Sequence, residues 1–262
     1  MRTALFREKY GQYALVIGGS YGLGAAFGEA IARRGVNVIL VARQEDRLMA
    51  TAARLRETYD VEVIAFAADV ADYESVKERL SDLNVPIGLL VYDAAYAPIG
   101  RFEDVSEDQL LRATEVNVRA PLLLAKFLSA SMIARGRGGI VLMSSLAGSQ
   151  GSPNLAAYAA TKSFNAILAE GLWKELKPLG VDVLACMAGA ILTPGYREAE
   201  SAKPAPGTLE AKDVAEQTLN SLGKGPIVIP GAVNKVARFL LTRLVSRRTA
   251  IAIMAKNTGG LS

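Results

Sequence analysis

The fold is decided by residues 13–24, Tyr13-Ala-Leu-Val-Ile-Gly-Gly-Ser-Tyr-Gly-Leu-Gly24, an apolar run that leads into a glycine-rich turn. The run from Tyr13 to Ile17 is typical of a short buried strand, and residues 25–34 after the turn are typical of a helix. Glycines in this position permit a tight turn and a close approach to a pyrophosphate, which the amides at the helix N-terminus bind. The segment therefore predicts a dinucleotide-binding site.

Strand and helix patterns alternate along the rest of the chain. Expected strands are 13–17, 36–41, 61–67, 87–92, 140–143, 181–187 and 227–229, and expected helices are 25–34, 44–59, 73–83, 107–135 and 156–177. Alternation at this spacing predicts the α/β class, and continuously apolar strands indicate a parallel sheet buried on both faces. We expect one dinucleotide-binding catalytic domain over residues 1–262. Its fold is a doubly wound Rossmann fold of about seven strands, with helices on both faces of the sheet.

The composition excludes several classes of protein. The chain has no histidine, which excludes a Ser-His-Asp hydrolase and a histidine-ligated metal site, so we expect no metal. Its single cysteine, Cys186, excludes internal disulfides, fits a reducing compartment and is expected to be buried in a strand. The first residues lack the apolar core of a signal peptide, and no run reaches the roughly 18 apolar residues of a spanning helix. A cytoplasmic location is therefore expected.

Four polar residues indicate a proton-transfer site. Tyr158 and Lys162 are four residues apart, so they lie on one face of the helix predicted over 156–177. A free tyrosine has a pKa of about 10, and a nearby ammonium lowers it toward the range of a useful general acid. Ser145, at the end of an apolar strand, can donate a hydrogen bond to a substrate oxygen. Asn117 lies further upstream, in the long helix.

The Tyr-x-x-x-Lys spacing alone is weak evidence for catalysis, because the chain contains it twice. Tyr73 and Lys77 have the same spacing but lie in a charged stretch, and the position thirteen residues before Tyr73 is Asp60 rather than serine. We expect that pair to lie on a solvated helix face. Tyr158 could instead be a packed core residue of its helix, but Ser145, Lys162 and the glycine turn favour a catalytic role.

The end of the second predicted strand selects the cofactor. An acidic residue there would bind ribose hydroxyls and favour NAD(H), but this chain has Ala42-Arg43. Arginine is suited to a phosphate, and Ser20 in the glycine turn can add a hydroxyl contact. The sequence therefore predicts NADP(H), with a solvated Arg43 as the alternative. Arg33 and Arg34, at the end of the first helix, are expected to be exposed.

From about Tyr10 onward the chain resembles a classical short-chain dehydrogenase/reductase, with a weaker similarity to the branch of 17β-hydroxysteroid and long-chain 3-oxoacyl reductases. The resemblance rests on the glycine turn, Asp69-Val70, Asn117, Ser145, Tyr158, Lys162 and Ala188-Gly-Ala-Ile-Leu-Thr193. It implies a catalytic set of Asn117, Ser145, Tyr158 and Lys162, in which Asn117 bends the long helix and holds a relay water. The implied cofactor-binding residues, together with Ser20 and Arg43, are Gly18, Tyr21, Gly22, Leu23, Gly24, Asp69, Val70, Ala94, Tyr158, Lys162, Gly189, Ile191 and Thr193.

One departure from the family pattern concerns the cofactor. Residues 92–95 read Tyr92-Asp-Ala-Ala95, where the family has Asn-Asn-Ala-Gly. We expect the added charge of Asp93 to weaken the binding of an anionic cofactor. A proline and a threonine of the family are also replaced, by Ala188 and Ile17.

The chain is therefore expected to transfer a hydride between NADP(H) and a carbonyl or secondary alcohol, as a reductase of an apolar, steroid-like or acyl ketone. The alternative is a non-catalytic NADP(H)-binding sensor or partner subunit. The resemblance implies a homodimer or homotetramer, and residues 194–210 are expected to line the substrate pocket. No acidic residue follows Glu216, and residues 232–256 mix an apolar stripe with a basic edge. Peripheral membrane contact and simple docking on the domain both remain open for this segment, whereas nucleic acid is disfavoured.

Overall fold

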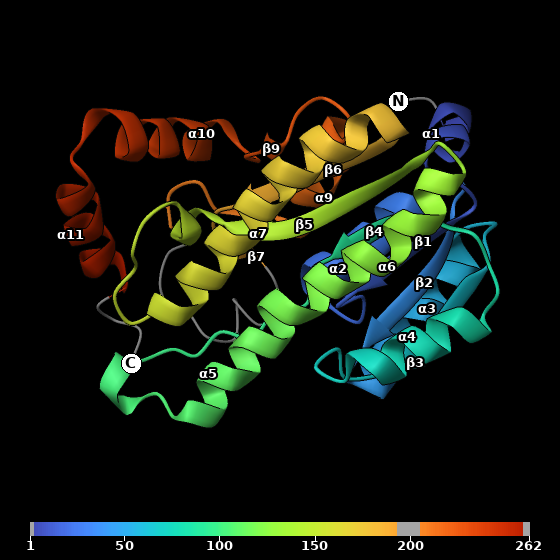
Figure 1. Ribbon diagram of the computed structural model, residues 1–262, viewed down its shortest axis with the longest axis horizontal. Helices are drawn as coiled ribbons and strands as arrows, with labels where there is room; N and C mark the ends of the chain where they lie inside the picture. Colours follow the sequence, from blue (N-terminus) through green and yellow to red (C-terminus); the bar gives the residue numbers. More distant parts are fainter. Residues whose placement is uncertain (1–2, 193–204, 259–262) are drawn as a thin grey trace.

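The computed structural model describes residues 3–192 and 205–258, which form a seven-stranded parallel sheet with helices on both faces (Figure 1). The strand order is β3-β2-β1-β4-β5-β6-β9. The strands are β1 (Tyr13–Ile17), β2 (Asn37–Ala42), β3 (Val63–Ala67), β4 (Ile87–Tyr92), β5 (Gly138–Ser145), β6 (Val181–Ala188) and β9 (Ile227–Val228). Two short strands, β7 (Ile191–Leu192) and β8 (Leu209–Glu210), pair separately.

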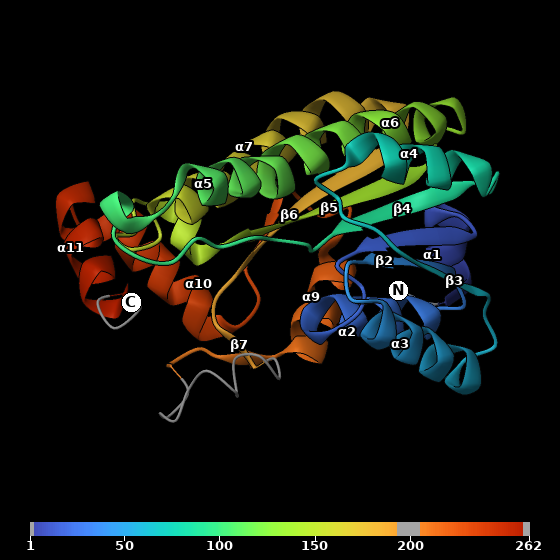
Figure 2. The same ribbon diagram turned by 90° about the horizontal axis from the view of Figure 1, so that it is seen from below.

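The helices form two layers, which Figure 2 shows on opposite sides of the sheet. One layer holds α2 (Gly22–Ala32), α3 (Glu45–Thr58) and α9 (Ala211–Ser221), and the other α4 (Tyr73–Asp82), α5 (Glu107–Thr114), α6 (Ala120–Ala134) and α7 (Ala156–Leu176). A first helix α1 (Thr3–Tyr10) packs near the start of β5, and α10 (Ala232–Phe239) and α11 (Arg247–Thr258) end the described chain. The short helical turns are η1 (Phe102–Asp104), η2 (Glu115–Arg119), η3 (Leu146–Ser149), η4 (Lys177–Leu179) and η5 (Leu240–Leu244).

Each face of the sheet has its own apolar core because successive strand residues point to opposite faces. In β2, Val38 and Leu40 belong to the core under α2 and α3, whereas Ile39 and Val41 belong to the core under α4 and α6. All four side chains are fully buried. This double burial explains why the strands are continuously apolar rather than alternating.

The topology places a binding crevice at one edge of the sheet. The chain runs from β1 outward to β2 and β3, then returns to the other side of β1 and continues through β4, β5 and β6. Ile17, the last residue of β1, pairs with Val41 on one side and with Tyr92 on the other. The carboxyl ends of β1, β2 and β4 therefore meet where the strand order reverses, which is where open α/β sheets bind ligands.

The predicted Rossmann fold is confirmed, with each of the seven predicted strands within a few residues of its expected bounds. The predicted helix 107–135 is interrupted by the π-helical turn η2, and α1, α9 and the β7–β8 pair were not predicted. The stretch Glu107–Ala134 is long and apolar enough to pass for a spanning helix, but half of its most apolar part is buried in the fold, as in a core helix.

Three side chains can be compared with the environments expected for them. Arg34 is buried rather than exposed, because its guanidinium donates to both carboxylate oxygens of Glu216 and to the Asn220 side chain, joining α2 to α9. Tyr73 is also buried, against the core under α4, whereas a solvated face was expected. Cys186 is buried in β6 as predicted and accepts a hydrogen bond from Thr218.

Candidate active site at the carboxyl edge of the sheet

The glycine-rich turn between β1 and α2 has no room for side chains. Gly18 and Gly22 have φ angles of +92° and +55°, which other residues rarely adopt. A Cβ atom on Gly18 would lie 2.8 Å from the Ala94 amide nitrogen, and one on Gly24 would overlap the Gly18 carbonyl. Since α2 begins at Gly22, the turn ends at a helix N-terminus, and this arrangement fits the pyrophosphate of a dinucleotide.

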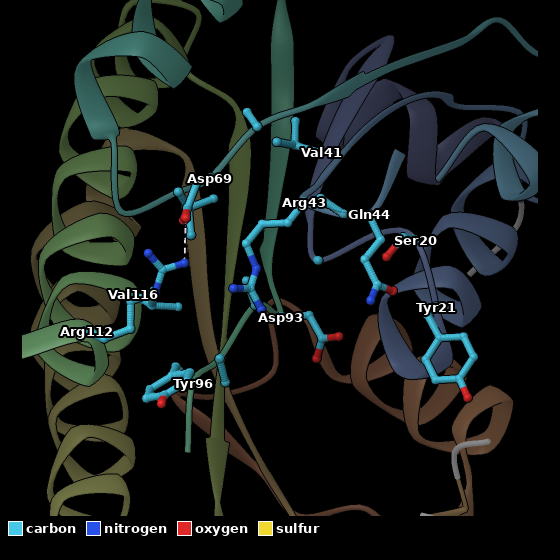
Figure 3. A pocket seen from close by; sticks show the side chains of 16 residues that line it. Ser20, Tyr21, Val41, Arg43, Gln44, Asp69, Asp93, Tyr96, Arg112 and Val116 are labelled. Atoms are coloured by element: carbon cyan, nitrogen blue, oxygen red, sulfur yellow. Dashed lines mark hydrogen bonds and ion pairs between the residues drawn. The ribbon is translucent and has the colours of Figure 1, made fainter. Parts of the chain in front are cut away.

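A cavity of about 340 Å³ opens beside this turn (Figure 3). It lies across the carboxyl ends of β1, β2, β3 and β4, at the reversal of strand order. Its lining is formed by Gly18, Ser20, Tyr21, Val41, Ala42, Arg43, Gln44, Ala68, Asp69, Val70, Asp93, Ala94, Ala95, Tyr96, Arg112 and Val116. Seven of the residues predicted to bind the cofactor are thus brought together: Gly18, Ser20, Tyr21, Arg43, Asp69, Val70 and Ala94.

Arg43 is exposed at the end of β2, and Figure 3 shows its side chain extending into the pocket between Asp69 and Asp93. Ser20, on the glycine turn, lies beside Gln44, the chain neighbour of Arg43. A second cation stands nearby, since the Arg47 guanidinium lies 4.8 Å from the centre of the Tyr21 ring. This end of the cavity is therefore suited to a phosphate monoester.

The Asp69 carboxylate accepts hydrogen bonds from two groups of the protein. One carboxylate oxygen accepts the Ala71 amide at 3.0 Å, and the other accepts Arg112 Nη2 at 2.5 Å. Burial would raise the pKa of Asp69, but these donors outweigh it and hold that pKa below its ordinary value. Sequence reasoning missed Arg112, because it comes from α5, forty-three residues away, and nothing local marks it.

Three of the predicted proton-transfer residues come together near Asp93, which lines this cavity. Tyr158 and Lys162 lie in the first two turns of α7, and Ser145 ends β5. The Lys162 ammonium lies 5.5 Å from the centre of the Tyr158 ring. Lys162 is fully buried and donates to the Met143 carbonyl at 3.0 Å. Its backbone carbonyl accepts the Ser144 hydroxyl at 2.7 Å, which fixes α7 against β5.

The pKa of Tyr158 lies above its ordinary value, whereas the sequence predicted a lowered pKa. Burial raises its pKa to about 12, a hydrogen bond with Ser145 offsets part of that, and the negative charge of Asp93 adds to it. Burial also lowers the pKa of Lys162 to about 8, although Asp93 opposes the change. Lys162 therefore does not lower the pKa of Tyr158 toward neutral pH, because burial of the phenol dominates.

Asn117 lies in the π-helical turn η2, so the long helix departs from α geometry at the residue expected to bend it. Its side-chain oxygen accepts the Tyr96 amide at 2.8 Å, and its side-chain nitrogen donates to the Tyr96 carbonyl and to Thr161. Thr161 in turn donates to the Tyr158 carbonyl, and Asn165 donates to the Asn117 carbonyl. Asn117 thus joins the loop after β4 to the catalytic helix.

The remaining cofactor-binding candidates lie elsewhere at this edge. Gly22, Leu23 and Gly24 form the first turn of α2, and Ile191 lies in β7. Gly189 follows β6, and a Cβ on it would lie 2.8 Å from the Asn234 side-chain oxygen. Thr193 lies outside the described residues.

Asn234 was also missed by sequence reasoning. It is buried in α10 and donates to the carbonyls of Gly207 and Pro230. It therefore anchors the C-terminal segment to the end of the predicted substrate loop. Of that loop, residues 194–204 lie outside the described residues.

The comparisons with known proteins agree with this geometry. The family model for short chain dehydrogenase matches residues 12–204. A solved structure from work on 7beta-hydroxysteroid dehydrogenase stereoselectivity is 29% identical, covers 95% of this chain and 99% of its own, and superimposes with a TM-score of 0.89. A short-chain dehydrogenase from Sphingobium yanoikuyae in complex with NADPH is 30% identical, with coverages of 89% and 96% and a TM-score of 0.77.

A third relative carries a different description. The inactive hydroxysteroid dehydrogenase-like protein 1 of Mus musculus is 33% identical over 204 residues. The match covers 76% of this chain but only 59% of the mouse protein.

Proposed function

This chain belongs to the classical short-chain dehydrogenases, near the hydroxysteroid branch, and on that premise we propose that it is an NADP(H)-dependent reductase of apolar ketones. The oxidoreductase class, acting on CH–OH or C=O groups, follows from the family. The observation that carries the proposal is the grouping of Ser145, Tyr158 and Lys162 next to Asp93, which lines the cavity at the reversal of strand order.

The side chains suggest how a proton is delivered. A nicotinamide, when bound, supplies the hydride for the carbonyl carbon. Tyr158 remains a neutral phenol at pH 7, because its pKa is about 12, and is therefore ready to donate its proton to the carbonyl oxygen. The Ser145 hydroxyl can donate a hydrogen bond to the same oxygen. Lys162 is mostly protonated at pH 7, since its pKa is about 8, and its positive charge stabilises the phenolate that is left.

The test is turnover of a panel of ketones by the wild type and Tyr158→Phe, followed by NADPH absorbance. We expect the substitution to lower turnover by about 10²–10⁴-fold, which is the usual contribution of a positioned general acid. NADPH binding should be preserved. Near-normal turnover by Tyr158→Phe would contradict the catalytic assignment.

The alternative, a non-catalytic NADP(H)-binding sensor or partner subunit, gains some support from the inactive mouse relative. Against it stands the complete set of Asn117, Ser145, Tyr158 and Lys162, since a protein that only binds a dinucleotide needs no proton donor. The same panel separates the two functions, because a sensor would bind NADPH and reduce no ketone.

Arg43 supports the choice of NADP(H) over NAD(H). Its guanidinium reaches into the cavity from the end of β2, where a 2′-phosphate on the adenine ribose would meet it. The NADPH complex of the Sphingobium relative supports the same choice. No acidic residue stands at the end of β2 to bind ribose hydroxyls instead.

We expect Arg43→Ala to raise the Kd for NADPH by roughly 10- to 150-fold, the usual worth of a charge-assisted hydrogen bond. The Kd for NADH, which lacks the phosphate, is the matched control and should hardly change. Fluorescence titration of both cofactors measures this. Equal affinity of the wild type for NADPH and NADH would overturn the assignment.

An apolar substrate is supported by the relatives and by the surroundings of Ser145. The loop after β5 is covered by α11, because Arg247 donates to the Ser149 carbonyl and Asn154 to the Thr258 carbonyl. Ile251 lies against Gly151 in the same loop. We propose that this C-terminal cover and residues 205–210 together form part of the wall of a pocket for a large ketone.

The C-terminal segment also presents an apolar surface to solvent. Its exposed residues are Val233, Val236, Phe239, Leu240 and Leu244, on α10 and η5. Lys235, Arg238, Arg243 and Arg247 border them, and no acidic residue follows Glu216. A second copy would meet this surface with the same positive charge, so we propose that an anionic lipid surface, reached from the cytoplasm, covers it.

Co-sedimentation with vesicles that contain phosphatidylglycerol tests this proposal at physiological salt. We expect Phe239→Ser/Leu244→Ser to abolish binding, because both side chains are more than half exposed and insert rather than pack. The matched control is Leu5→Ser/Phe102→Ser, a similarly exposed pair outside the C-terminal segment, which should bind like the wild type. If the wild type does not bind these vesicles, the proposal of membrane contact is wrong, and the segment only docks on the domain.

Exposed apolar residues on a different face support a homo-oligomer. Leu111, Leu122 and Ile167 are exposed on α5, α6 and α7, which lie in the same layer of helices. We propose that a second copy of the chain covers them, as a homodimer or homotetramer. Sedimentation equilibrium measures the state directly.

A further inference from the structure

Asp93 brings a carboxylate to the N-terminus of α2. It follows β4 and faces the cavity in Figure 3. The Gly24 amide, in the first turn of α2, donates to it, and a Cβ on Gly24 would lie 3.1 Å from its Oδ2 atom. The N-cap residue of this helix, Tyr21, makes no side-chain capping bond. Asp93 therefore supplies from another strand the negative charge that a helix N-terminus favours.

The charges around Asp93 come from three elements besides its own. Lys162 and Tyr158 face it from α7, and the Cys186 thiol faces it from β6. On the open side, Figure 3 shows Arg43 reaching toward it from the end of β2. Lys162 and the Gly24 amide favour the carboxylate form, but burial outweighs them and raises the pKa of Asp93 to about 6. The group can thus change charge near neutral pH.

A bound dinucleotide would place a second anion at the same helix end. The glycine turn and the first amides of α2 are the part of the site that fits a pyrophosphate. Two anions sharing one helix N-terminus repel each other, and the repulsion raises the pKa of the group that can take up a proton. A protonated carboxyl is neutral, as is the asparagine that the family has at this position.

We propose that Asp93 couples cofactor binding to proton uptake: the dinucleotide binds more tightly to the form of the chain in which the Asp93 carboxyl is protonated. The proton comes from solvent, no covalent bond to the cofactor forms and no group is oxidised or reduced. The inference rests on the proposed function, because it takes NADPH as the ligand. Asp93 is in this account a positioning residue whose charge sets cofactor affinity, not a catalytic residue.

The experiment is calorimetric titration of NADPH at pH 6, in buffers of different ionisation enthalpy, which counts the protons taken up. At that pH the free carboxyl is half protonated, and if binding raises its pKa to about 7, uptake is about 0.4 proton. Lys162, whose pKa is about 8, stays protonated and contributes little. The same rise in the Asp93 pKa should raise the wild-type Kd as the pH increases above 6, by up to about fivefold.

Two variants separate proton uptake by Asp93 from proton uptake by other groups. Asp93→Asn keeps the shape and removes the titration, so its uptake should fall by about the 0.4 proton expected for Asp93. Asp82→Asn removes an exposed carboxylate at the end of α4, outside the lining of this cavity, and its uptake should match the wild type. The cofactor's own 2′-phosphate titrates in all three proteins and cancels in the difference.

The outcomes are distinct. Binding of NADPH with equal proton uptake by the wild type and Asp93→Asn overturns this inference alone. Absence of NADPH binding overturns the proposed function and this inference with it. If Asp93→Asn does not fold, infrared difference spectra of the wild type decide, since binding must produce the carbonyl stretch of a protonated carboxylic acid, and its absence overturns the inference.

Discussion

The close approach of three backbone segments at the carboxyl end of β1 is the constraint on which the rest of the site depends. Gly18 lies against the Ala94 amide, and Gly24 lies against the Gly18 carbonyl, with no space for a Cβ at either place. This contact brings the first turn of α2 onto the end of β4. The dinucleotide crevice and the carboxylate of Asp93 both follow from it. A side chain larger than hydrogen at Gly18 or Gly24 would separate these elements.

A second set of contacts fixes the catalytic helix relative to that crevice. The Ser144 hydroxyl donates to the Lys162 carbonyl, and Gly148 lies against the Ser163 amide, so α7 cannot slide along β5. From the other side, Asn117 binds Thr161 and the backbone of Tyr96. Tyr158 is thereby held at the edge of the sheet by contacts to two neighbouring elements, which is what a proton donor of fixed position requires.

Much of the fold could be predicted from the sequence, because local pattern determines it. The apolar strands, the glycine turn and the spacing of Tyr158 and Lys162 are local, and each lies where the pattern placed it. Arg112 and Asn234 could not be found, since their partners Asp69 and Gly207 lie far along the chain. The burial of Arg34 and the direction of the Tyr158 pKa were predicted wrongly, because both depend on the packing of distant segments.

The central claim is that the glycine turn and Tyr158 serve one reaction, the transfer of hydride from NADPH to a carbonyl carbon with a proton to its oxygen. The most direct measurement uses NADPH labelled with deuterium at the transferred position, an apolar ketone and mass spectrometry of the alcohol. The account predicts one deuterium on the carbinol carbon in the product of the wild-type chain. An alcohol without deuterium, or tight NADPH binding with no alcohol from any ketone, would contradict it.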